Sequence, residues 1–176
     1  TLIFPRQYYS GVDYTSFSLV VDENNLERFS NIKAIIFGPY SFSYVTDLTL
    51  DMSLLPSSVK VILMEGAFSA AFADSGRRLG SGRRLAGGSL IIKLPSGSSV
   101  TFENGSGKNF ETVTVGGEDV NFEVGEDSLS EVTNVEYTDE ESKESANNLA
   151  GAISNSRPDQ VTPTVAPVPT TEIPTT

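Results

Sequence analysis

The stretch between Phe42 and Leu54 alternates between apolar and polar side chains. Apart from Thr46, its even positions are apolar: Phe42, Tyr44, Leu48, Leu50, Met52 and Leu54. Because side chains alternate between the two faces of a strand, this period predicts a β-strand with one apolar and one polar face. Pro56 ends the strand because proline lacks the N–H that pairing needs. The stretch is long for a single strand, so we expect a bend near Thr46.

Three segments share a second pattern, with apolar residues at the first, fourth and sixth positions. They begin at Ile32, Val45 and Val59, so the pattern recurs at nearly equal intervals. Leucine-rich repeats have a similar local pattern, but their repeat is longer than these intervals, at roughly 20–29 residues. We therefore predict consecutive antiparallel strands and not a solenoid.

Turn residues separate the remaining predicted elements. Further strands are expected at 14–21, 90–94, 99–103, 111–115, 119–124 and 132–137. The composition of 95–98 and of Gly116-Gly117 is typical of hairpin turns, so the strands on either side of each are expected to pair with one another. A capping-box pattern at 138–141 precedes apolar residues at helical spacing, which predicts a short helix over 139–153.

These elements predict an all-β fold, an antiparallel β-sandwich that is immunoglobulin-like or jelly-roll-like. The sandwich would cover residues 1–137, either as one unit or as two halves, 1–74 and 88–137, joined by a basic glycine-rich loop at 75–88. A weak helix or linker would follow at 138–156. A Pro/Thr-rich extended stalk would cover 157–176, where frequent proline disfavours helix and sheet.

Composition narrows the chemistry. Cys and His are both absent, which excludes disulfides, the usual zinc sites, Ser-His-Asp triads and cysteine nucleophiles. We therefore predict no catalytic residue, no metal ligand and no cofactor. The formal charge of −11 argues against nucleic acid as a partner, and no apolar stretch is long enough for a membrane span.

Charge is strongly segregated along the chain. Residues 111–144 hold twelve acids and one base, whereas residues 77–93 hold five bases and no acid. Four of those bases, Arg77, Arg78, Arg83 and Arg84, lie in two Ser-Gly-Arg-Arg-Leu repeats. We interpret this segment as an exposed loop, with docking onto the acidic surface of a neighbouring copy as the alternative.

Candidate glycosylation sites indicate an extracellular location. Pro/Thr tracts are typical of O-glycosylated stalks outside the cell. The candidate O-linked sites are Thr162, Thr164, Thr170, Thr171, Thr175 and Thr176. Asn104 is a candidate N-linked site because Asn104-Gly105-Ser106 is the chain's one N-x-S/T sequon.

The leading functional hypothesis is a secreted structural subunit that self-assembles head to tail into an extracellular fibre or surface coat. The donated strand would carry Leu2, Ile3, Phe4, Tyr8 and Tyr9, and the four loop arginines would set its orientation. The alternative is a stalked cell-surface adhesion or carbohydrate-binding module. A third hypothesis, a hydrolase that uses paired carboxylates, stays open because acids are plentiful.

Overall fold

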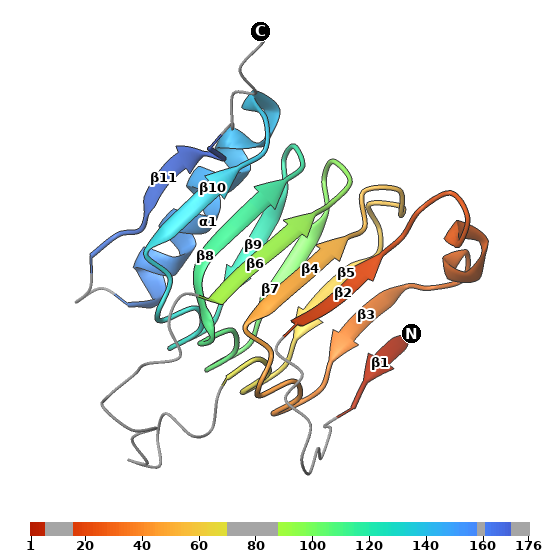
Figure 1. The fold of residues 1–176 in the computed structure, drawn as a ribbon, viewed down its shortest axis with the longest axis horizontal. Coiled ribbons are helices and arrows are strands. Elements are labelled where there is room, and N and C mark those ends of the chain that lie inside the picture. Colours follow the sequence, from red (N-terminus) through yellow and green to blue (C-terminus); the bar gives the residue numbers. More distant parts are fainter. Residues whose placement is uncertain (6–15, 70–87, 158–160, 170–176) are drawn as a thin grey trace, which may run out of the picture.

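A computed structural model describes residues 1–5, 16–69, 88–157 and 161–169. It consists of two all-parallel sheets and one long helix (Figure 1). The five-stranded sheet contains, in spatial order, β1 (Leu2–Phe4), β3 (Ala34–Phe37), β5 (Lys60–Leu63), β7 (Ser99–Phe102) and β9 (Asn121–Val124). The six-stranded sheet contains β11 (Thr164–Pro167), β10 (Asn134–Tyr137), β8 (Phe110–Gly116), β6 (Gly88–Lys93), β4 (Asp47–Asp51) and β2 (Ser16–Val20). The helices are η1 (Leu26–Phe29), η2 (Glu140–Ser142) and α1 (Lys143–Ser156).

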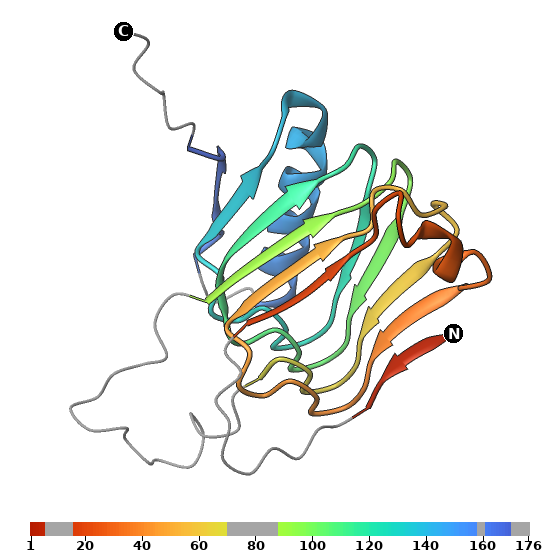
Figure 2. The ribbon, with the colours of Figure 1, turned by 45° about the vertical axis from the view of Figure 1, so that its right-hand side comes forward.

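The predicted antiparallel sandwich is therefore wrong. Every strand pairing within the described residues is parallel. From β1 to β10 the chain alternates between the two sheets, so that each strand pairs with the strand two places further along the chain. The chain winds as a flattened β-solenoid with two strands in each coil (Figure 2).

The interval from Ile32 to Val45, and again from Val45 to Val59, measures half a coil. A full coil separates strands that pair: Ile35 of β3 is in register with Val61 of β5, and Val100 of β7 is in register with Phe122 of β9. The full coil thus falls within the range of solenoid repeats that the half-coil interval led us to reject. The two predicted hairpins are also wrong, because β6 and β8 lie in one sheet while β7 and β9 lie in the other. Their turn residues form corners between the sheets.

The core lies between the two sheets and is built from in-register rows of apolar side chains. One row of the six-stranded sheet contains Phe17, Leu48, Leu90, Val113, Val135 and Val165. Facing it from the five-stranded sheet is the row Phe4, Phe37, Leu63, Phe102 and Val124. Because neighbouring coils place the same side of each strand inward, identical alternation in every coil buries one continuous core.

One type of corner recurs on the path from the five-stranded to the six-stranded sheet. Two residues with positive φ flank a small buried residue: Tyr40-Ser41-Phe42, Gly66-Ala67-Phe68, Gly105-Ser106-Gly107 and Asp127-Ser128-Leu129. This corner explains why the long alternating stretch is not one strand. Phe42 has a φ of 54°, a left-handed conformation that no strand contains, so the strand begins only at Asp47.

The helix predicted over 139–153 is confirmed as η2 followed by α1, and α1 closes one end of the solenoid (Figure 1). Its Ser142 Oγ accepts a hydrogen bond from the Gly117 N–H (2.9 Å), and its Ser145 Oγ accepts one from the Val120 N–H (3.1 Å). After the helix, Arg157 donates to the carbonyl oxygens of Ser130 and Val132. These contacts satisfy backbone groups that a further coil would otherwise have paired. Burial lowers the pKa of Arg157, and the nearby Glu131 carboxylate partly offsets this.

Both ends of the chain differ from expectation. Leu2, Ile3 and Phe4 pair with β3 of the same chain. Four residues of the Pro/Thr tract form β11 and pair with β10, so the expectation that this tract forms no sheet is wrong there. Pro167 is tolerated because β11 is an edge strand.

Candidate functional site: the outer face of the five-stranded sheet

The outer face of the five-stranded sheet carries a row of side chains that changes character partway along. In register, from β1 to β9, the row contains Ile3, Ile36, Ile62, Thr101 and Glu123. Ile3 is 58% exposed, and the two other isoleucines are half-buried although no described element covers them. The face is therefore apolar over β1, β3 and β5 and polar over β7 and β9.

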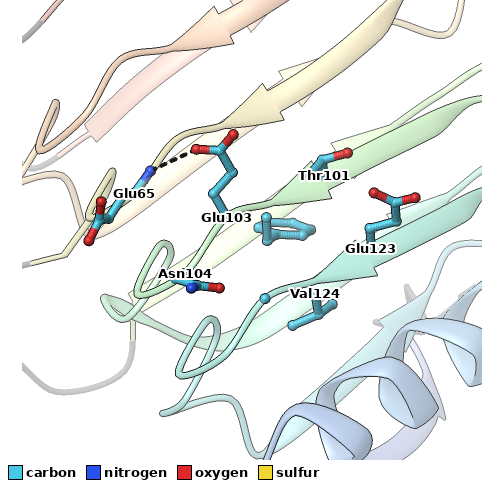
Figure 3. Close-up of a pocket in the computed structure, with 8 residues that line it drawn as sticks. Glu65, Thr101, Glu103, Asn104, Glu123 and Val124 are labelled. Carbon is cyan, nitrogen blue, oxygen red and sulfur yellow. Dashed lines mark hydrogen bonds between the residues drawn. The ribbon is translucent and has the colours of Figure 1, made fainter.

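A shallow trough of about 490 Å³ occupies the polar half (Figure 3). It forms where Glu103, just after β7, lies beside Gly125, which has no side chain to fill the space. Glu103 also accepts a hydrogen bond from the backbone N–H of Glu65 (3.2 Å), which fixes it toward the end of β5. A Cβ on Gly125 would approach Asn104 Oδ1 to 2.5 Å, so the close passage of the two chain segments requires glycine.

The trough is acidic. Glu65, Glu103 and Glu123 line it, and none of the described residues that line it is basic. Within the described part of the chain, no three His, Cys, Asp or Glu side chains gather closely enough to hold a metal ion. An open acidic surface beside exposed isoleucines suits a cationic group carried by a larger partner better than a small enclosed ligand, which needs a deeper cavity.

Of the predicted glycosylation sites, the trough contains only Asn104. Its side chain is exposed on the rim, and its Oδ1 accepts a hydrogen bond from the Glu126 N–H (3.0 Å). Thr162 and Thr164 are exposed near α1 and β11, and Thr162 Oγ1 lies 3.0 Å from Ser154 Oγ. The remaining candidate residues lie outside the described residues: Tyr8, Tyr9, Arg77, Arg78, Arg83, Arg84, Thr170, Thr171, Thr175 and Thr176.

The acidic segment 111–144 does not form a single patch. Glu123 lies on the outer face of the five-stranded sheet, whereas Glu136 lies on the outer face of the other sheet. Sequence reasoning missed the site because it assigned neighbouring strands to hairpins. The signal was present, since aligning Ile36, Ile62 and Thr101 at the coil period places them in one row.

Among the described helices, none is both long and apolar enough to cross a membrane. No family model, curated protein or solved structure matches this chain, so its function is argued from its own geometry.

Proposed function

We propose that this chain is a stalked, non-enzymatic adhesion module that binds a protein segment carrying both apolar and cationic side chains. The observation that carries the proposal is the in-register row on the five-stranded sheet, in which exposed isoleucines lead directly to Thr101 and Glu123. Solenoids commonly use such extended faces for binding.

The two halves of the face would contribute differently. Covering an exposed isoleucine stabilises a complex by roughly 1.5–3 kcal/mol when burial is complete, so Ile3, Ile36 and Ile62 would supply affinity. The carboxylates of Glu103 and Glu123 would steer a cationic partner and fix its direction, an effect that salt weakens.

The position of the stalk supports this use. β11 and α1 lie at one end of the solenoid, and β1 lies at the other end (Figure 1). The Pro/Thr tract continues after β11, so the apolar half of the binding face lies away from the point where the tract leaves the sheet. An O-glycosylated tract in an extracellular setting stays a prediction that fits this arrangement.

Two synthetic peptides of equal length test the proposal, one alternating Arg with Leu and the other alternating Glu with Leu. We expect the Arg-Leu peptide to bind in isothermal titration, with an affinity that falls as salt rises, and the Glu-Leu peptide not to bind. Replacing Glu103 and Glu123 with Gln should weaken binding of the Arg-Leu peptide by about tenfold. Equal binding of both peptides, or of neither, would overturn the proposal.

Self-assembly is our second proposal, and it is favoured by the edges of β1 and β2. Neither edge pairs with a further strand among the described residues, and an open edge is a template for pairing. At the other end, α1 covers the core and β11 carries Pro167, which favours closed pairs of molecules over an open fibre. Sedimentation over a range of concentrations separates a monomer, a pair and a growing polymer.

A further inference from the structure

The outer face of the six-stranded sheet differs from the face described above. One in-register row crosses all six strands and contains only short polar residues: Ser16, Asp47, Ser89, Thr112, Asn134 and Thr164. Every member is exposed or half-buried. The row contains no aromatic, aliphatic or basic side chain.

This row is a rigid and evenly spaced array. Neighbouring strands lie about 4.8 Å apart, so hydrogen-bonding side chains recur at that interval across the sheet. The backbone ladder holds each strand, and Ser89 Oγ donates to Asp47 Oδ1 (3.1 Å), which links two neighbouring members. Groups fixed in place in this way lose little conformational entropy on binding.

We propose that this row binds an extended neutral polysaccharide that lies across the strands. Hydroxyl, amide and carboxylate groups match the hydroxyls of a sugar, and a pyranose ring is close in length to the strand spacing. Charge also selects the partner. Asp47 in this row and Glu136 in the next outward row would repel sulfated or uronic acid polymers, as would the net charge of −11, whereas a neutral polymer meets no such repulsion.

The absence of aromatic platforms in the row determines how the affinity depends on length. Each sugar would gain only hydrogen bonds, which contribute about 1 kcal/mol each in water. A single sugar would therefore bind very weakly, and affinity would accumulate only for a chain that spans several strands. This surface is distinct from the proposed protein-binding face, so either could fail without the other.

The experiment measures depletion of the whole protein from solution by insoluble chitin, amorphous cellulose and insoluble mannan, with a soluble uronic acid polymer tested as a competitor. We expect binding to at least one neutral polymer. Soluble oligosaccharides of that polymer should compete more strongly as they lengthen, with little effect from the monosaccharide or from the acidic polymer. Binding to none of the three, or equal competition at all lengths, would overturn the proposal.

Matched variants locate the surface. Replacing Ser89 with Ala and Thr112 with Val removes two hydroxyls from the row and should reduce polysaccharide affinity about tenfold. Ser99→Ala with Thr101→Val makes the same chemical change on the outer face of the other sheet and should leave affinity unchanged. If both pairs reduce binding equally, or neither does, the row is not the binding surface. Because length-dependent competition uses the unaltered protein, the test stands even if a variant folds poorly.

Discussion

Ile62 and Thr101 occupy the same outward position on the neighbouring strands β5 and β7. The outer face of the five-stranded sheet changes from apolar to polar at this one step, and the acidic trough begins beside it. A cationic, apolar segment that crosses the strands would meet isoleucine on one side of this step and carboxylate on the other. The proposed binding mode depends on this juxtaposition.

The recurring corner predicts opposite effects for one substitution at two glycines. Gly105 has a φ of +72° and an added Cβ would find its nearest neighbour, Lys108, at 3.9 Å, so Gly105→Ala should cost about 1–2 kcal/mol through backbone strain alone. Gly151 lies within α1 with open space around it, so Gly151→Ala should stabilise the protein by about 1 kcal/mol. Urea denaturation of both variants measures the two effects. Destabilisation by both would contradict the open surroundings of Gly151.

The buried residues of the corners predict a second contrast. Ser41 Oγ is buried without a hydrogen-bond partner, and Ala67 occupies the equivalent position in the next coil. Ser41→Ala should therefore leave the free energy of unfolding unchanged or raise it by up to about 1 kcal/mol. Ser128 Oγ donates to the Glu103 carbonyl, so Ser128→Ala should lower it by about 1 kcal/mol. Equal losses in the two variants would mean that Ser41 is hydrogen-bonded in solution.

The helical cap predicts a local effect on β9. Ser145→Ala removes the acceptor of the buried Val120 N–H, which should cost about 1–3 kcal/mol. Hydrogen exchange should report faster exchange at Val120 and little change at β3. Asn148→Ala, on the exposed side of the same helix, serves as the control and should leave both unchanged. Unaltered exchange at Val120 in the Ser145 variant would contradict the capping role of that serine.

How far the sequence predicts this fold can be judged from two elements. The alternation of Leu48 and Leu50 correctly predicts which side chains of β4 face the core, because side-chain alternation is a local property of a strand. The pairing partners are set over a whole coil and were predicted wrongly. Turn residues such as Pro95 and Gly97 reverse the chain in a hairpin, but they also form a corner between two sheets.

The candidate site was harder to predict than the core. Glu103 and Ile62 are far apart in the chain, and residues 70–87 interrupt the coil period between them. Neither residue belongs to a sequence motif, and only the parallel register places them on one face. By contrast, the position of Asn104 in a turn was predicted correctly, since Asn-Gly is a local turn signal.

Glycosylation is a further prediction, because Asn104 lies on the rim of the trough. Native protein should carry N-linked sugar there and O-linked sugar in the Pro/Thr tract, and intact mass with enzymatic deglycosylation measures both. Removing the N-linked sugar should strengthen binding of the Arg-Leu peptide, because the sugar would lie beside Glu103. A native mass equal to that of the bare polypeptide would remove the glycan prediction and weaken the argument for an extracellular location.

The most direct test of the proposed function compares the same two substitutions on the two outer faces. Ile62→Lys with Glu123→Lys alters the five-stranded sheet, and Ile91→Lys with Glu136→Lys makes the matched change on the six-stranded sheet. Titration with the Arg-Leu peptide should show a loss of at least about tenfold in affinity for the first variant and an affinity within about twofold of the unaltered protein for the second. Equal losses in the two variants, or no loss in the first, would contradict binding through the outer face of the five-stranded sheet.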